Sequence, residues 1–195
     1  EIFDYPEEFF KERIHNIRRP KPDDFQIKQA MEKIKKSKKP IIISGGGVFY
    51  SDAMDELGSF AIKHNIPVTQ TVMGYSTMKR DHSHFLGPIG GLGGRAANNL
   101  AKETDLAICV GTKLADFTTG SWANFENPEF KLVSINIARH DANKHLAEAV
   151  IGDAKVCLSE LSNSLGNWKS PDSWHKKSQD ELKSVSYTHL RAHET

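Results

Sequence analysis

The residues of this sequence whose types and spacing could do chemistry gather in three glycine-rich clusters. The first cluster, Gly45-Gly46-Gly47, follows a short apolar run and precedes a helical pattern. Backbone N–H groups at the start of a helix can bind an anion. A tight turn between a strand and a helix requires the same glycines without any ligand. The turn alone is the slightly favoured interpretation, and an anion site here stays open.

The second cluster, Gly91-Leu92-Gly93-Gly94-Arg95-Ala96, fits the G-x-G-x-x-A template of dinucleotide-binding turns. That template requires a strand before the glycines and an acidic residue at the tip of the following strand. Gly87 and Pro88 make the preceding segment a poor strand, and Asp116 is expected in a loop. The match therefore does not predict an NAD site.

The third cluster follows the clearest apolar run and contains Gly111, Thr112, Lys113, Asp116 and Phe117. Lys113 could bind a phosphate, and Asp116 could accept a hydrogen bond from a ligand hydroxyl. A loop with two solvated charges explains the same residues equally well. The sequence favours neither the ligand site nor the solvated loop.

Outside the glycine clusters, no pattern predicts a catalytic nucleophile or a metal centre. Asp81, His82 and His84 could together bind a metal, but no second cluster supplies further ligands, so a solvated loop is favoured. Cys109 and Cys157 lie far apart, within an apolar run and an amphipathic pattern, which predicts buried free thiols. We therefore predict no catalytic residues and no metal ligands.

An alternating series of strands and helices must position these clusters. Apolar runs without polar alternation are typical of strands buried on both faces, and they occur at 41–44, 68–71, 106–110, 132–137 and 150–151. Helical spacing of apolar residues follows Asp23 or Asp24, follows Ser51, and covers 95–103 and 156–165. The alternation predicts an α/β fold with a doubly wound, Rossmann-like parallel sheet, in which ligands bind beyond the carboxyl ends of the strands. The glycine clusters fall at those ends.

Composition and charge limit the classes of partner. The 195 residues include 26 basic and 25 acidic ones, which gives no global reason to expect nucleic acid or an anionic membrane. No run approaches the roughly 20 apolar residues of a membrane span, and free cysteines favour a cytoplasmic location. The absence of an initiator Met suggests a piece of a longer protein. We expect a linker over 1–24, a central domain over 25–166, a second linker over 167–185 and a non-native tail over 186–195.

In this order, the clusters resemble the middle domain of thiamine-diphosphate enzymes of the acetolactate synthase superfamily. The residues that carry the resemblance are Lys39-Pro40 to Gly47, Ile66-Pro67-Val68-Thr69, Met73-Gly74, Asp81-His82, Leu86-Gly87, Ala97-Asn98 and Asp105 to Phe117. Within the superfamily, the chain most resembles the trihydroxycyclohexane-1,2-dione hydrolases of inositol catabolism. That likeness rests on Phe3-Asp4-Tyr5-Pro6, Asp116-Phe117-Thr118-Thr119-Gly120-Ser121 and Asp141-Ala142-Asn143-Lys144.

The resemblance implies that thiamine diphosphate and Mg²⁺ serve the intact enzyme but are bound by two other domains. In flavin-containing relatives, the counterparts of Gly45 to Gly47, Leu92-Gly93 and Gly111 to Phe117 line an FAD site. The inositol-pathway enzymes are not known for flavin chemistry, so FAD is not expected, and these residues form a candidate groove that is empty or repurposed. Lys113 stands where arginine is common, and Tyr75 and Ser83 replace an expected lysine and proline. These departures bear on the substrate more than on the fold.

The implied activity is that of a hydrolase that opens a cyclic 1,2-dione by thiamine chemistry, with this domain structural and inactive by itself. The implied partners are the flanking catalytic domains and further copies in a homo-oligomer, without nucleic acid or membrane. Two alternatives remain open: an acetolactate synthase-like carboligase with FAD in this domain, and a stand-alone nucleotide-binding module.

Overall fold

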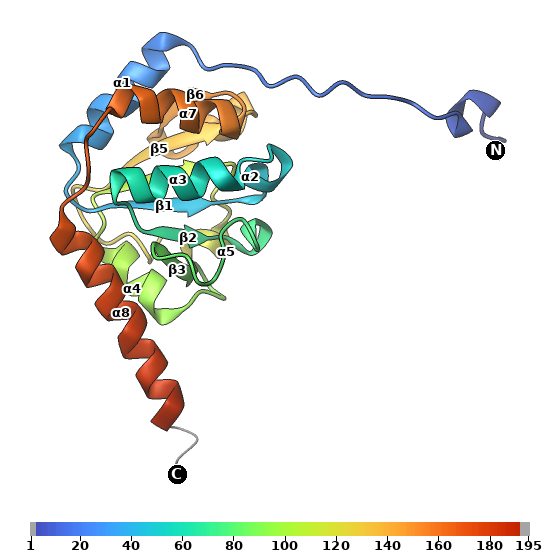
Figure 1. Cartoon of the computed structure of the whole chain (residues 1–195). Coiled ribbons are helices and arrows are strands. Elements are labelled where there is room, and N and C mark those ends of the chain that lie inside the picture. The colour runs from blue at the N-terminus through green and yellow to red at the C-terminus, as the bar shows by residue number, and fades with distance from the viewer. Residues whose placement is uncertain (1–2, 192–195) are drawn as a thin grey trace.

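A six-stranded sheet lies between two layers of helices in the computed structural model, which describes residues 3–191, with side chains up to residue 184 (Figure 1). All strand pairings are parallel, and the strand order is β3-β2-β1-β4-β5-β6. The order reverses direction between β1 and β4, so the predicted doubly wound sheet is confirmed. The strands are β1 (Pro40–Ser44), β2 (Val68–Gln70), β3 (Phe85–Pro88), β4 (Leu106–Val110), β5 (Lys131–Asn136) and β6 (Glu148–Ile151).

Five helices cover the sheet. On one face lie α1 (Asp24–Lys36), α3 (Met54–His64) and α7 (Ala154–Leu165); on the other lie α4 (Arg95–Glu103) and α8 (Asp172–Arg191). Short helices follow the strand ends and bring the chain across the carboxyl edge of the sheet. These are α2 (Gly46–Tyr50), η2 (Val72–Gly74), α5 (Asp116–Thr119), α6 (Arg139–Ala142) and η3 (Lys144–Leu146).

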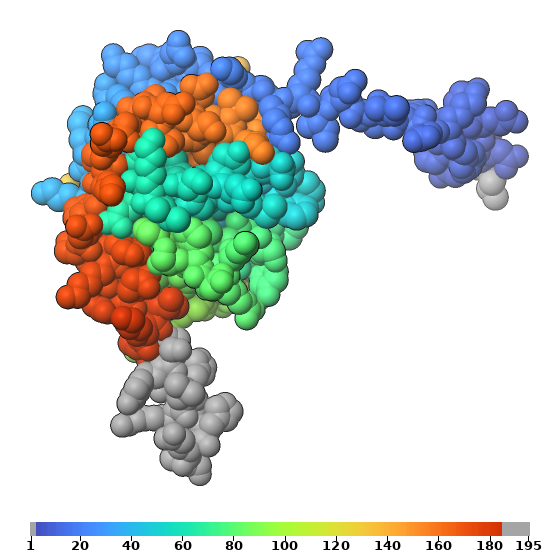
Figure 2. All heavy atoms as spheres, viewed as in Figure 1, coloured from blue at the N-terminus to red at the C-terminus, as the bar shows by residue number. Residues whose placement is uncertain are grey.

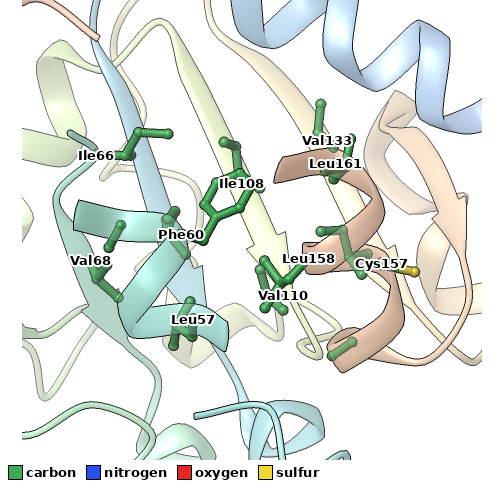
Figure 3. Close-up of a cluster of buried hydrophobic side chains, with 14 of the residues drawn as sticks. Leu57, Phe60, Ile66, Val68, Ile108, Val110, Val133, Cys157, Leu158 and Leu161 are labelled. Atoms are coloured by element: carbon green, nitrogen blue, oxygen red, sulfur yellow. The ribbon is translucent and has the colours of Figure 1, made fainter. Parts of the chain in front are cut away.

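Side-chain alternation along the strands divides the core into two halves. In β4, Ile108 and Val110 face α3 and α7, whereas Ala107 and Cys109 face α4. The larger half contains residues of α3 and α7 packed over β4 and β5 (Figure 3). Each fully buried Leu, Ile or Phe side chain contributes about 1.5–3 kcal/mol. Helices and buried side chains cover both faces of the sheet, so a binding site can form only at the ends of the strands.

The residues before α1 form an arm (residues 3–19) that stands clear of the body (Figure 2). The arm contains the short helix η1 (Glu7–Phe10) and is otherwise extended. Its base is tied down where Arg19 Nη1 donates to Asp153 Oδ2 at 3.0 Å and Asp153 N–H donates to the Pro20 carbonyl at 2.9 Å. The exposed aromatic side chains of the arm are Phe3, Tyr5, Phe9 and Phe10.

Two expectations about the second and third clusters were wrong. The segment that contains Gly87 and Pro88 is a strand, β3, at the edge of the sheet. An edge strand tolerates proline because one of its sides has no partner strand to receive an N–H. Asp116 begins the short helix α5 rather than lying in an irregular loop.

Helix α8 replaces most of the linker predicted over residues 167–185. Its inward side contains Trp174, which is 3% exposed, and Ser178, which is fully buried. Because one of these two inward residues is a serine, the segment lacks the apolar periodicity from which a helix is predicted. Residues 192–195 lie outside the described part of the chain, so a non-native tail over 186–195 stays a prediction.

Candidate functional site

The carboxyl ends of β1 and β4 meet at the point where the strand order reverses. Ser44 and Val110, the last residues of these strands, are register partners. In doubly wound sheets, the two connections that leave such a point run to opposite faces and open a crevice between them. The first and third glycine clusters begin there, directly after Ser44 and Val110.

The turns after β1 and β4 touch backbone to backbone. Gly47 N–H donates to the Gly111 carbonyl at 2.9 Å, and Gly45 N–H donates to the Val110 carbonyl at 2.8 Å. A Cβ added to Gly47 would lie 2.6 Å from Gly111 Cα, and Gly111 has a φ of +61°. The close approach and the left-handed conformation explain these glycines. The amides of Gly45 and Gly47 are already engaged within the fold.

The second cluster folds over α5. Gly91 N–H donates to the Phe117 carbonyl at 2.8 Å, which joins the second cluster to the third. The Asn98 side chain accepts from Gly90 N–H and donates to the Gly90 carbonyl, both at 3.0 Å. Gly90 has a φ of +104°, so this clamp depends on a glycine. As a result, the loop tip with Leu92 projects beside Phe117.

A groove of about 460 Å³ opens between the three clusters. Gly45 does not line this groove, because it is buried against Thr112, and Gly93 is turned onto Gly90. Asp116 also lies outside the lining. The predicted residues that do line it are Gly46, Gly47, Leu92, Gly111, Thr112, Lys113 and Phe117.

The sequence analysis missed about half of the groove. The segment after β2 contributes one wall because β2 pairs with β1, which brings its end to the same edge. The sequence did contain a signal for this wall: residues directly after any buried parallel strand must lie at this edge of the sheet. Ala115 lies within the range Gly111 to Phe117 that was expected to form the groove, and the lining residues not predicted are Tyr50, Thr71, Val72, Met73, Ile89 and Thr118.

The chemistry of the groove is mostly apolar. Among the described residues that line it, Lys113 is the one charged side chain, and it is exposed. The described lining contains no carboxylate, imidazole or thiol, so its hydroxyl groups and the Lys113 amine have no carboxylate or imidazole beside them to act as a general base. The arrangement can bind a flat apolar surface together with one negative charge.

Exposed apolar side chains occur in the segments that follow the strand ends, five of them in the groove lining, and they define what we call the carboxyl-edge face. Each member is more than half exposed and lies in a segment that follows β1, β2, β3, β4 or β5. Extended apolar patches on a protein surface mark sites of interaction. The members are Phe49, Tyr50, Val72, Met73, Tyr75, Leu92, Phe117, Ile137 and Leu146.

The other candidate residues lie away from the groove. His84 is 7% exposed, so the solvated loop expected for residues 81–84 was wrong at this residue. Within the described chain, no group of three or more His, Cys, Asp or Glu side chains could hold a metal ion. Cys109 and Cys157 are buried free thiols, as predicted. Burial raises the pKa of Cys157 to about 12 and raises that of Cys109 well above its usual range.

Comparison with known proteins assigns this geometry to a family. The family model described as thiamine pyrophosphate enzyme, central domain, matches residues 27–161, more than half of the chain. The chain belongs to this family. The same fold occurs in the X-ray structure of a Mycobacterium smegmatis protein described as a thiamin diphosphate-dependent enzyme. The TM-score is 0.63 at 21% identity, and the match covers 80% of this chain and 30% of that chain.

Three bacterial relatives of the central domain carry the name 3D-(3,5/4)-trihydroxycyclohexane-1,2-dione hydrolase. The Clostridium perfringens (strain 13) protein is 47% identical over 161 residues, which cover 83% of this chain and 25% of the relative. The Clostridium botulinum (strain Alaska E43) protein is 43% identical over 183 residues, 94% of this chain and 28% of the relative. The Bacillus cereus (strain ZK) protein, whose name ends in the number 1, is 45% identical over 165 residues. These cover 85% of this chain and 26% of the relative. The resemblance stated from the sequence is confirmed, and the chain spans about a quarter of each relative.

Proposed function

We propose that the central domain is part of a thiamine-diphosphate-dependent hydrolase that opens the ring of a trihydroxycyclohexane-1,2-dione in inositol catabolism. The observation that carries this proposal is the 47% identity, over 83% of this chain, to a relative of that name. Because the chain covers 25% of that relative, the activity is proposed for the longer protein.

In this proposal, the other domains hold thiamine diphosphate and Mg²⁺. A bound Mg²⁺ prefers carboxylate and phosphate oxygens, whereas the groove lining supplies Lys113 and no carboxylate. The residues present here do not fit the cofactor, so we assign no step of ring opening to this chain. FAD is not part of the proposal, since the relatives are named as hydrolases.

The proposed role of the central domain is to pack its carboxyl-edge face against a catalytic domain of the same protein. The base of the arm lies at the same edge as this face, because Ile17 and Arg18 line a hollow together with Gly47 and Tyr50. The exposed aromatic residues of the arm and the exposed apolar residues of the face would then be covered together. Covering them would remove apolar surface from water, which favours association.

Two broader features complete the proposal: a homo-oligomer and a cytoplasmic location. Buried free thiols at Cys109 and Cys157 support a reducing compartment. Among the helices that the structure describes, none is long and apolar enough to cross a membrane.

A chimaera tests the proposed activity. The C. perfringens relative, with its matched segment replaced by this chain, should retain dione ring opening in the presence of thiamine diphosphate and Mg²⁺. The 195-residue chain alone should show no turnover under the same conditions. A folded chimaera without ring opening, or turnover by the isolated chain, would overturn the proposal. A flavin absorption band in the pure chimaera would instead favour the carboligase alternative, and tight calorimetric binding of NAD, FAD or ADP to the chain would favour the nucleotide-binding module.

A matched pair of variants in the chimaera tests the docking role. Met73→Asp places a charge on the carboxyl-edge face, whereas Ile62→Asp places one on the outer side of α3. Both parent side chains are exposed, at 76% and 55%, so neither change creates a cavity in this domain. We expect Met73→Asp to lower ring-opening activity and Ile62→Asp to leave it unchanged. Equal activity in the two variants would contradict the docking role.

A further inference from the structure

Two imidazole rings from distant parts of the chain stack where α8 meets the loop before β3. His84 directly precedes β3, and His175 lies in the first turns of α8. Their ring centroids are 4.1 Å apart and their planes are inclined by 20°. His84 is 7% exposed, so the stack lies at the margin of the core rather than in bulk water.

The surroundings of the stack suit neutral rings. Asn65 Oδ1 is an acceptor and lies 3.3 Å from His84 Nε2, so Nε2 carries the hydrogen and donates a hydrogen bond. His84 Nδ1, 2.9 Å from Ser83 Oγ, then accepts a hydrogen bond from the hydroxyl. His175 Nδ1 is buried without a hydrogen-bond partner in the described structure. Among the described residues, no acceptor would therefore receive a hydrogen bond from a proton on His175 Nδ1.

The charged and titratable groups around the stack come from two elements, the loop before β3 and α8. His82, in the loop before β3, has its ring centroid 5.9 Å from that of His84, and its buried Nε2 also lacks a partner within the described residues. Asp172 on α8 acts on His175 and favours its protonated form, but Asp172 Oδ1 already accepts from Asn65 Nδ2, after α3, at 3.0 Å. Burial, followed by the nearby His175 and His82, lowers the pKa of His84 to about 4. Burial also lowers the pKa of His175.

The stacked geometry distinguishes this cluster from a metal centre. The in-plane lone pairs of two nearly parallel rings point side by side instead of converging on one ion. The described residues also contain no group of three side chains able to hold a metal. A change of protonation is therefore the chemistry that remains open to the stack, because imidazole is the side chain whose ordinary pKa lies closest to neutral pH.

We propose that the His84–His175 stack is an acid-sensitive latch that holds the first turns of α8 against the loop before β3. When both rings are protonated, two like charges face each other at the margin of the core, and the stack opens. The first turns of α8 would then move away from the loop before β3, and the hydrogen bond that Gln179 Nε2 donates to the Ser83 carbonyl at 2.7 Å would be lost with them. The Trp174 Nε1 bond to the Pro40 carbonyl, at 2.8 Å, would give way last.

Hydrogen exchange of the 195-residue chain tests the latch. We compare amide protection in residues 172–184 with that in β4, at about pH 7 and about pH 4.5, after correction for intrinsic exchange rates. Protection of α8 should fall at least about tenfold relative to β4 on acidification, the factor that corresponds to one pKa unit. Equal loss of protection in α8 and β4 would show global unfolding and overturn the latch.

A substitution separates the stack from other acid-sensitive groups. His175→Phe retains an aromatic ring at the contact, cannot be protonated and should keep α8 protected at the lower pH. The matched control His140→Phe changes an exposed histidine and should behave like the parent. Acid release of α8 in a folded His175→Phe variant would refute the proposal. Should that variant fail to fold, the NMR titration of His84 in the parent chain decides: a midpoint near 6.5 would refute the latch, and one near 4 would support it.

Discussion

Replacing Gly47 with alanine should push apart the turns that follow β1 and β4. The new Cβ would lie 2.6 Å from Gly111 Cα and 3.0 Å from the Gly111 carbonyl oxygen. Because both neighbouring atoms are backbone, no side chain can swing aside, and overpacking of this kind costs about 1–3 kcal/mol. The higher helix propensity of alanine in α2 offsets at most about 1 kcal/mol. A separation of 2.6 Å from a backbone atom places the cost at the upper end of that range, so we expect a net loss of about 1–2 kcal/mol in the free energy of unfolding.

Two other glycines separate crowding from backbone strain. Gly166 has a φ of +62° and a ψ of −120°, and no described atom lies within 4 Å of an added Cβ, so Gly166→Ala measures the cost of this positive-φ conformation alone. A sparsely populated backbone conformation of this kind costs an L-residue about 1–3 kcal/mol. Gly111→Ala combines a φ of +61° with a Cβ that would lie 2.5 Å from Gly47 Cα. Its expected cost is therefore larger, about 2–5 kcal/mol.

Urea unfolding followed by circular dichroism measures all three variants, and an unchanged m-value confirms that the stability alone has changed. The double variant Gly47→Ala/Gly111→Ala should lose less stability than the two single losses added together, because one separation of the turns relieves both clashes. If Gly47→Ala were as stable as the parent while Gly166→Ala was destabilised, the close approach of the two turns would not constrain the fold, and the reasoning would be refuted.

Three further predictions concern α8, acid stability and the thiols. Trp174→Ala should lower the free energy of unfolding, measured in urea, by about 3–5 kcal/mol, because the Trp174 ring is 3% exposed and its Nε1 donates to the Pro40 carbonyl. A loss under about 1 kcal/mol would show that α8 docks without this side chain. The pKa of His84 is about 4 in the folded chain, below the ordinary value of 6.5. Stability should therefore be complete above pH 6.5 and fall by about 1–2 kcal/mol as the pH drops to 4, after allowance for solvent screening; urea unfolding across that range measures it, and a flat profile would contradict it. Iodoacetamide should leave Cys157 unmodified in the native chain and label it in urea, as read by mass spectrometry, because burial raises the pKa of this thiol to about 12; rapid native labelling would contradict its burial.

The sequence was sufficient for the strands that are buried on both faces. Every side chain of β1 and β4 is buried, so their apolar runs stand out without knowledge of any neighbour. The edge strand β3 contains Gly87 and Pro88, and the inward side of α8 contains Ser178. Both elements owe their conformation to the body against which they pack, since their own residue patterns favour neither.

For the candidate site, the sequence by itself determined the three glycine clusters, because glycine is required wherever backbones approach closely or φ is positive. It also determined the family, since the matched residues lie in and around those clusters. Only the tertiary structure decided that Met73 shares a groove with Lys113 and that His84 stacks on His175. The physical reason is that a local pattern records whether each residue is buried, whereas the order β3-β2-β1-β4-β5-β6 is set by packing between segments far apart in the chain.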